Sequence, residues 1–311
     1  MKTISIITPC FNEEDSIVEC YEKVAALFQG PLAQYRREHI FCDNCSTDST
    51  VEKLREIAKT DANVKIIVNS RNFGILRNTF NGVVNATGDA ILLFMPVDLQ
   101  DPPELLPEFV KLWEQGYEIV FGIRAQREEP FLMRTLRHLY YQGISRLSYI
   151  DFPPDVGDFQ LIDRKVLEAM KQFDDRQPFM RMMTFDCGFR SIGVPYTWRA
   201  RARGISRNRL SQLIDQGLIG LISFSNIPMR LALFFGAILS FVSVAYALFV
   251  LIAAVVGGTG APRGIPTIII ALFFFSGLQF LFLGLLGEYI IAIHNQSRKR
   301  PIVVERERIN F

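Results

Sequence analysis

The chain has 311 residues, and its 34 Lys and Arg against 32 Asp and Glu leave a net charge of +2, with 21% of residues charged. This balance excludes an acidic disordered chain and a general nucleic-acid binder. The hydrophobic fraction is 49%, and residues 231–262 and 264–287 contain no Asp, Glu, Lys, Arg or His. Each run exceeds the roughly 20 apolar residues that span a bilayer. The sequence therefore predicts a membrane protein with a large water-exposed part.

The first 125 residues alternate between short β-rich runs and helical patterns, which is typical of βαβ units on a largely parallel sheet. We expect strands at 5–8, 40–42, 64–68, 90–95 and 119–121, and helices at 14–28, 47–59, 76–85 and 104–114. Further along we expect a helix at 133–147, a strand beginning at 157–159, a helix at 165–173 and a strand at 192–200. The predicted fold class is therefore α/β, with a Rossmann-like, mostly parallel sheet.

Residues 208–225 carry apolar side chains at i, i+3 and i+4 spacing, which predicts a helix with one apolar face. This helix either packs on the soluble domain or lies in the membrane interface. The arginines that precede it, Arg203 and Arg207 among them, favour the interface.

Two spans, at about 231–256 and 265–290, are expected to form a hairpin after this helix. Arg263 is the one charge in their connection, whereas both flanks of the hairpin are rich in arginine. By the positive-inside rule, both termini and the large domain face the cytoplasm of a multi-pass protein in the inner (plasma) membrane. The expected organisation is a cytoplasmic domain at 1–207, an amphipathic interfacial region at 208–228, the transmembrane hairpin at 229–295 and a cytoplasmic basic tail at 296–311.

Polar side chains follow four of the expected strands at the point where each strand ends. Asn12 and Glu13 follow the first strand, Asp43 the second, Asn72 the third and Asp98 the fourth. In open α/β sheets, ligands bind beyond the carboxyl ends of the strands. These side chains are therefore the first candidates for a binding site.

Asp98 is the first candidate metal ligand, with the Gln100 amide oxygen or Asp101 as a helper. Oxygen ligands at a strand end suit Mg²⁺ or Mn²⁺, which bridge phosphates and neutralise the charge of a departing diphosphate. The alternative is that the two acids cap the helix that follows, since acids favour helix N-termini. Capping explains one acid but not a cluster of two acids and an amide.

The motifs at the strand ends form an ordered set: PCFNEE (9–14), STD (46–48), RNFG (71–74) and DLQDPP (98–103). This set resembles family 2 glycosyltransferases with the GT-A fold. The later motifs GDFQL (157–161), DR (163–164) and RGIS (203–206) narrow the resemblance to the polyprenyl-phosphate branch, the dolichyl-phosphate mannose synthase-like enzymes. With two spans after the catalytic domain, the chain is most similar to bacterial bactoprenol glucosyltransferases. The resemblance covers about residues 3–210.

The resemblance implies an inverting hexosyltransferase that moves glucose from UDP-glucose onto undecaprenyl phosphate, or a similar polyprenyl phosphate, for surface glycan modification. GDP-mannose, UDP-amino-arabinose and UDP-N-acetylhexosamine stay open as donors. The implied nucleotide-sugar contacts are Pro9, Phe11, Glu13, Asp43, Asn72, Asp98 and Gln100. The implied acceptor-phosphate contacts are Arg124, Arg137 and Arg203, and the implied metal ligands are Asp98 and Gln100.

Asp158 matches the position that the family uses as catalytic acid or base, and Asp98 is the second implied catalytic residue. A phosphate monoester is mostly dianionic at neutral pH and needs little help from a base. An ordinary Asp, with a pKa of about 3.9, is also a weak base. We therefore expect Asp158 to orient the acceptor or contact the sugar as much as to take a proton.

The sequence departs from the family pattern in two places. The first acid of the usual Asp-x-Asp motif would fall at Pro96, and the usual Asp-Asp-Gly after the second strand is Asp43, Asn44 and Cys45. Metal coordination then depends more on Asp98 and Gln100.

Two rival functions stay open. A processive polysaccharide synthase would carry a Gln-x-x-Arg-Trp motif and more spans, and Trp113 and Trp198 stand in no such context. A catalytically weak membrane scaffold is the second rival, and Pro96 and Asn44 keep it open. We expect no nucleic-acid partner, and we expect a homo-oligomer, with a tetramer among the options, formed through apolar helices.

Overall fold

The computed structural model describes residues 1–126, 156–198, 234–236, 238–239, 241–242, 265–298 and 300–311. The helices expected at 133–147 and 208–225, and the residues Arg137 and Arg203, lie outside this part of the chain. Most of the first expected span lies outside it as well. The chain divides into two compact units, of which the first holds most of residues 1–214 together with Lys299–Phe311.

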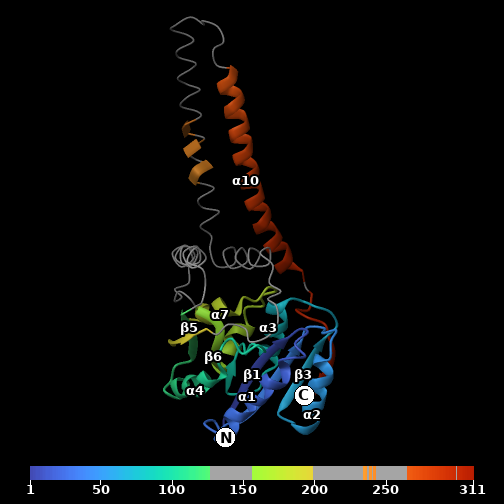
Figure 1. The fold of residues 1–311 in the computed structure, drawn as a ribbon. Coiled ribbons are helices and arrows are strands. Elements are labelled where there is room, and N and C mark those ends of the chain that lie inside the picture. The colour runs from blue at the N-terminus through green and yellow to red at the C-terminus, as the bar shows by residue number, and fades with distance from the viewer. Residues whose placement is uncertain (127–155, 199–233, 237, 240, 243–264, 299) are drawn as a thin grey trace, which may run out of the picture. The chain divides into compact units, whose positions relative to one another are not determined.

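The first unit is built on one eight-stranded sheet in the order β7-β5-β6-β4-β1-β2-β3-β8 (Figure 1). All strands except β6 and β8 run in one direction, because only these two pair antiparallel with their neighbours. The prediction of an α/β fold with a mostly parallel sheet is confirmed. The strands are β1 (Thr3–Cys10), β2 (Arg36–Asp43), β3 (Val64–Asn69), β4 (Ala90–Leu92), β5 (Ile119–Gln126), β6 (Val156–Asp163), β7 (Ser191–Thr197) and β8 (Glu305–Ile309).

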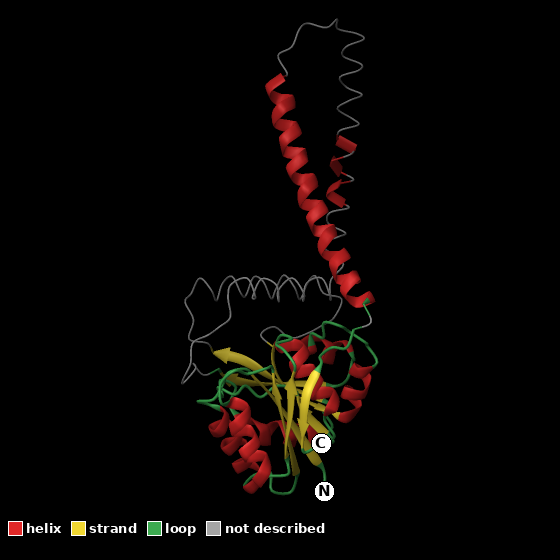
Figure 2. Ribbon diagram, turned by 90° about the vertical axis from the view of Figure 1, so that its right-hand side faces the viewer, coloured by secondary structure: helices red, strands yellow, loops and turns green. Residues whose placement is uncertain are grey.

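Helices cover both sides of this sheet (Figure 2). Strands covered on both faces are buried along nearly their whole length, and β1 is buried from Ile4 to Cys10. This burial explains why the central strands read as continuous apolar runs. The helices of the first unit are α1 (Ile17–Gln29), α2 (Thr50–Thr60), α3 (Ile75–Asn85), the 3-10 turn η1 (Pro103–Leu105), α4 (Leu106–Glu114), α6 (Arg164–Lys171) and α7 (Met180–Asp186).

Two elements differ from the sequence prediction. The fourth strand ends at Leu92 and not at residue 95, although the backbone still bonds to both neighbouring strands beyond that point: Leu93 N donates to Gln160 O, and Met95 N to Ile7 O. The short helix α7 was not predicted. Both differences lie beside the carboxyl edge of the sheet.

The segment read from the sequence as a basic tail contributes β8, an edge strand paired antiparallel with β3. Its side chains tie it to the helices beside it: Arg55 Nη2 lies 2.6 Å from Glu307 Oε2, and Asn81 Nδ2 lies 2.6 Å from Glu305 Oε1. Asn310 Nδ2 also donates to the carbonyls of Ala58 and Val64. Deleting residues 208–311 would therefore remove part of the sheet as well as the spans.

The second unit contains α10 (Ile265–Ser297), which begins where the second span was expected and extends beyond it. Within the described residues, one stretch, Phe274–Ser297, is long and apolar enough to cross a membrane. Large apolar side chains such as Phe274, Phe280 and Ile293 are exposed on it.

Gly82 on α3 marks a close approach between this helix and the sheet. A Cβ added at Gly82 would lie 2.3 Å from Cys42 Sγ and 2.8 Å from Ile7 Cγ2. We predict that Gly82→Ala lowers the unfolding free energy by about 1–3 kcal/mol, because overpacked cores shift backbone and side chains. Thermal unfolding of the full chain in detergent, followed by circular dichroism, measures this loss.

Gly284→Ala is the matched control, since a Cβ there meets no described atom within 4 Å. Its melting temperature is expected to stay within experimental error of the parent. Equal melting temperatures for Gly82→Ala and the parent would contradict the close packing of α3 on β1 and β2.

Candidate functional site

The carboxyl ends of β1, β2, β4, β5 and β7 lie at one edge of the sheet, and the antiparallel strand β6 begins at that same edge. Asp43 ends β2, Arg124 and Tyr196 lie near the ends of β5 and β7, and Asp158 lies near the start of β6. Strand direction alone therefore brings residues far apart in sequence to one edge.

The turns after β1 and β2 are bonded to each other. Asn12 N donates to Ser46 Oγ at 2.9 Å, and Thr47 N donates to Asn12 Oδ1 at 2.7 Å. Glu13 N donates to Thr50 Oγ1 at 2.9 Å. Pro9, at the end of β1, is buried, whereas Phe11 and Glu13 are half-buried in the turn that follows.

Asp43 is a buried carboxylate between these two turns. Its Oδ2 accepts from Ser46 N at 2.9 Å, and its Oδ1 accepts from the Ser46 hydroxyl. Burial raises the pKa of Asp43, and the bonds from Ser46 offset part of that rise. An acceptor held in this way suits hydroxyl groups such as those of a ribose.

Four asparagines, Asn44, Asn69, Asn72 and Asn78, form a side-chain network behind the turns after β2 and β3. Asn44 Nδ2 donates to Asn72 Oδ1 at 2.9 Å, while Asn44 Oδ1 accepts from Asn69 Nδ2 at 3.3 Å and from Phe73 N at 2.9 Å. Asn69 Nδ2 also donates to Asn78 Oδ1 at 2.7 Å. Because Asn44 donates and accepts at once, this network explains why an amide stands where the family pattern has an acid.

Cys45 occupies the position of the family's glycine and has the left-handed φ of 67° that favours glycine. A side chain in this conformation costs on the order of 1 kcal/mol. The Cys45 thiol lies 3.7 Å from Ser70 O, which links the turn after β2 to the end of β3.

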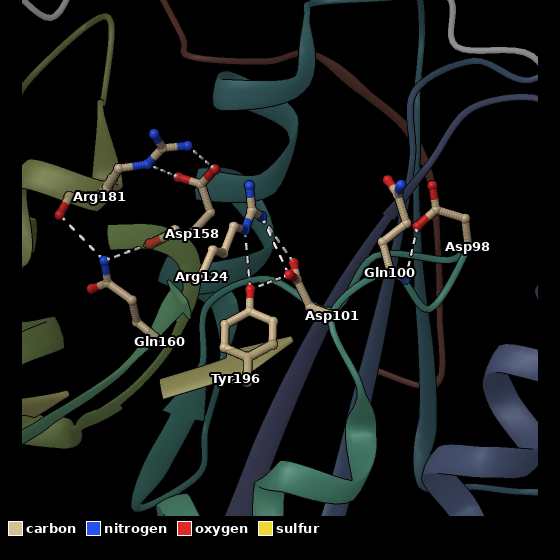
Figure 3. A network of polar contacts seen from close by, with 9 residues as sticks. Asp98, Gln100, Asp101, Arg124, Asp158, Gln160, Arg181 and Tyr196 are labelled. Atoms are coloured by element: carbon tan, nitrogen blue, oxygen red, sulfur yellow. Dashed lines mark hydrogen bonds and ion pairs between the residues drawn. The ribbon is translucent and has the colours of Figure 1, made fainter. Parts of the chain in front are cut away.

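Asp98 and Gln100 lie beside each other just after β4, where both side chains are half-buried (Figure 3). Gln100 N lies 3.3 Å from Asp98 Oδ1, and Leu99 between them has a left-handed φ of 54°. Their oxygens are the donor type that Mg²⁺ and Mn²⁺ prefer. Among the described residues there is no group of three His, Cys, Asp or Glu that could hold a metal. This donor set fits a divalent ion that takes its remaining ligands from a nucleotide diphosphate and water.

Asp101 does not join Asp98 but is buried against Arg124 and Tyr196 (Figure 3). Arg124 Nη2 lies 3.2 Å from Asp101 Oδ2, Arg124 Nε donates to Tyr196 Oη at 3.0 Å, and the Tyr196 hydroxyl donates to Asp101. Burial opposes the charge of Arg124, but Asp101 and Tyr196 together outweigh it and raise the pKa of Arg124. Asp101 is thus bonded to Arg124 and Tyr196, and its expected role as a helper at the metal site stays a prediction.

Asp158 forms a bidentate ion pair with Arg181 on α7. Arg181 Nε lies 3.1 Å from Asp158 Oδ1, and Arg181 Nη2 lies 2.6 Å from Asp158 Oδ2. Burial works against ionisation of Asp158, but Arg181, and at longer range Arg124, outweigh it and lower the pKa of Asp158. The carboxylate is therefore ionised at neutral pH.

The structure thus brings together Pro9, Phe11, Glu13, Asp43, Asn72, Asp98, Gln100, Arg124 and Asp158 at one edge of the first unit, while Arg137 and Arg203 lie outside the described residues. Sequence reasoning missed Arg181 and Tyr196. The alternation of buried Val194 and Tyr196 was a signal for an inward-facing Tyr196. No motif in the sequence analysis includes Arg181.

Comparison with known proteins matches residues 5–171 to the family described as Glycosyl transferase family 2. The chain is 34% identical over 301 residues to the uncharacterized glycosyltransferase YkcC of Bacillus subtilis (strain 168), which covers 96% of this chain and 92% of that protein. It is 32% identical over 299 residues to the bactoprenol glucosyl transferase of Shigella phage SfV, which covers 96% of each. Among solved structures, it is similar to the mannosyltransferase PcManGT from Pyrobaculum calidifontis in complex with GDP-Man and Mn²⁺. The TM-score is 0.48 at 18% identity, over 96% of this chain and 88% of that one.

The asparagine network generates a prediction for Asn44→Asp. The new carboxylate cannot donate to Asn72 Oδ1, and Asn72 cannot turn its amide without losing the bond that its Oδ1 accepts from Gly74 N. One oxygen of the new carboxylate at the buried position 44 is then left without a donor, and such an unsatisfied buried group costs about 1–3 kcal/mol. We expect Asn44→Asp to lower the unfolding free energy by that amount, measured by denaturant unfolding of the full chain in detergent.

Gln115→Glu makes the same change from amide to acid at an exposed position and serves as the control. Its expected effect is a few tenths of a kcal/mol, as for an acid near a helix C-terminus. A stability loss for Asn44→Asp no larger than that of Gln115→Glu would show that Asn44 need not donate.

Proposed function

The chain belongs to glycosyl transferase family 2 and is a glycosyltransferase, and we propose that it transfers glucose from UDP-glucose to undecaprenyl phosphate with inversion at the anomeric carbon. One observation carries the proposal: Asp43, Asp98 and Asp158 lie at one edge of the sheet, in a chain that also contains an apolar helix of span length. The bactoprenol glucosyl transferase of Shigella phage SfV, matched over nearly the full chain, supports the acceptor class and the sugar.

The nucleotide-sugar binds, in this proposal, over the ends of β1, β2 and β3. Pro9 and Phe11 line the base, Asp43 accepts from the ribose hydroxyls, and Glu13 and Asn72 complete the contacts around the nucleoside. The bonds between the turns after β1 and β2, together with the bond from Asn44 to Asn72 after β3, support this assignment. They hold the three strand ends in one arrangement before a ligand arrives.

Asp98 and Gln100 would hold Mg²⁺ or Mn²⁺ together with the donor diphosphate. The charge that develops on the departing UDP would be neutralised by an ion held there. Asp98 contributes the one carboxylate of this donor set, so we assign it the larger share of the affinity.

The acceptor phosphate attacks the anomeric carbon from the side opposite the diphosphate, forming a C–O bond as the bond to UDP breaks. A phosphate that is mostly dianionic needs cations to dock it more than it needs a base. Arg124, Arg137 and Arg203 are the proposed docking residues. Arg124 also forms the ion pair with Asp101, so we propose that it contacts the phosphate from that fixed position.

We place the enzyme in the inner (plasma) membrane with its catalytic domain, both termini and the phosphate of the lipid acceptor on the cytoplasmic side. The apolar helix α10 and the charge asymmetry of the flanks support this location. A second span at 231–256, an interfacial helix at 208–228 and a homo-oligomer are parts of the same proposal. GDP-mannose, UDP-amino-arabinose and UDP-N-acetylhexosamine are the alternative donors.

The reaction predicts a lipid-soluble radiolabelled product when the purified full-length chain is incubated with UDP-glucose, undecaprenyl phosphate and Mg²⁺ or Mn²⁺. Chelator should abolish the product. Asp98→Asn should lower kcat/KM by about 100-fold, which is ~2.7 kcal/mol of transition-state stabilisation. Scintillation counting of the organic phase measures both effects.

Glu108→Gln, an exposed acid on α4, is the control and should retain full activity. If product forms only from another nucleotide-sugar, the proposed sugar is wrong and the proposed mechanism stands. Absence of product with every donor would contradict the proposed activity and favour a scaffold.

A further inference from the structure

The ion pair between Asp158 and Arg181 joins two elements that sequence reasoning did not connect, β6 and α7. The guanidinium of Arg181 approaches the carboxylate side-on (Figure 3). Its Nε lies 3.1 Å from Asp158 Oδ1, and its Nη2 lies 2.6 Å from Asp158 Oδ2. Two parallel bonds fix the plane of the carboxylate as well as its distance. The side chains of Arg181 and Asp158 are 21% and 25% exposed, so the pair is partly shielded from water and still accessible to a ligand.

Gln160 fixes the position of the helix that carries Arg181. This fully buried side chain donates from Nε2 to Gly157 O at 3.0 Å and to Arg181 O at 3.3 Å, and its Oε1 accepts from Thr184 Oγ1 at 2.8 Å. The start of β6 and the first turn of α7 are thereby bonded through one amide. Arg181 therefore meets Asp158 from a backbone held in place by Gln160.

Among the described residues, the charged groups that act on Asp158 come from two elements. Arg181 on α7 is the direct partner, and Arg124 on β5 acts at longer range, where it already forms its own pair with Asp101 and Tyr196. Of these two cations, removing Arg181 would leave Asp158 only the distant one, which is largely neutralised by its own partners. Arg181 is the group that holds the carboxylate ionised.

An ionised carboxylate can only accept hydrogen bonds, and it has about four acceptor positions. Two of these are used by Arg181. The remaining positions suit a hydroxyl donor and disfavour a second anion such as a phosphate, because like charges at close range repel. The contact that this arrangement favours is therefore a hydroxyl of the transferred sugar.

We propose that Arg181 is a positioning residue for glycosyl transfer, which fixes Asp158 in one orientation as an ionised acceptor for a sugar hydroxyl, with Gln160 setting the place of Arg181. The inference rests on the proposed transferase function, because Asp158 is the group through which Arg181 acts. It adds Arg181, which stands in no motif of the sequence, and gives a role to Gln160 within the motif at 157–161.

The test compares Arg181→Gln, Arg181→Lys, Asp158→Asn and the double variant Asp158→Asn/Arg181→Gln in the full-length protein, with UDP-glucose and undecaprenyl phosphate at pH 5 to 8. At pH 7.5 we expect Arg181→Gln to lower kcat about 10- to 100-fold and to change KM for UDP-glucose less than 3-fold, as for an interaction made in the transition state. Arg181→Lys keeps the positive charge but cannot form two parallel bonds to the carboxylate. Its kcat should therefore lie between that of Arg181→Gln and that of the parent.

The ratio of the Arg181→Gln rate to the parent rate gives the decisive pH profile, because the titration of the acceptor phosphate cancels in it. Without Arg181 the pKa of Asp158 rises, so the ratio should fall at least 3-fold further between pH 7.5 and pH 5. The double variant should be no slower than Asp158→Asn, since Arg181 acts through Asp158. A ratio that is constant with pH, or fully additive losses, would overturn the proposal.

Thermal unfolding of the same variants separates this proposal from the proposed function. If the two side chains are paired, the melting temperature lost in the double variant is smaller than the sum of the two single losses. If the parent is active and Arg181→Gln has the same kcat, the positioning role of Arg181 is refuted and the transferase function stands. If the parent is inactive with every donor, the transferase function is refuted. Additive thermal losses would refute the pairing in either case. Arg36→Gln, at an exposed arginine that begins β2, is the control and should match the parent in every assay.

Discussion

Burial of carboxylates at one edge of a parallel sheet is the constraint on which the site depends. A parallel sheet gathers its strand ends, and here Asp43, Asp101 and Asp158 are brought to the same edge. An unpaired charge in such a place costs several kcal/mol, so each acid needs a partner. Asp43 receives the hydroxyl and amide of Ser46, Asp101 receives Arg124 and Tyr196, and Asp158 receives Arg181. The three carboxylates therefore have different partners: a hydroxyl and an amide for Asp43, an arginine and a tyrosine for Asp101, and a single arginine for Asp158.

Sequence reasoning reached those parts of the site that local pattern specifies. The βα alternation located the central strands within a few residues, and the sequence placed Asp43 at the end of the second strand, where the structure has it. The ion pair of Asp101 with Arg124 could not be predicted, because the two residues lie on separate elements 23 residues apart in the chain. Arg181 was missed because its partner lies 23 residues earlier on another element. Such a pairing is created by tertiary structure and leaves no period in the sequence.

The last strand shows the same limit for the fold. Residues 305–309 read as a charged tail, since Glu and Arg alternate there, and yet they form β8. Charged side chains are common on edge strands, where one face remains in water and the charges discourage further pairing. What makes this segment a strand is the open edge of β3 together with partners on α2 and α3, none of which is visible locally.

The position of β8 after α10 has a consequence for biosynthesis. The strands β1 to β7 are complete well before the ribosome reaches residue 305, so the edge of β3 remains unpaired while the apolar helix is being made. An exposed sheet edge is prone to pair with other chains during this interval. The sheet gains β8 only after α10 has been made, so translation that stops before residue 305 leaves the edge of β3 unpaired on an otherwise folded domain.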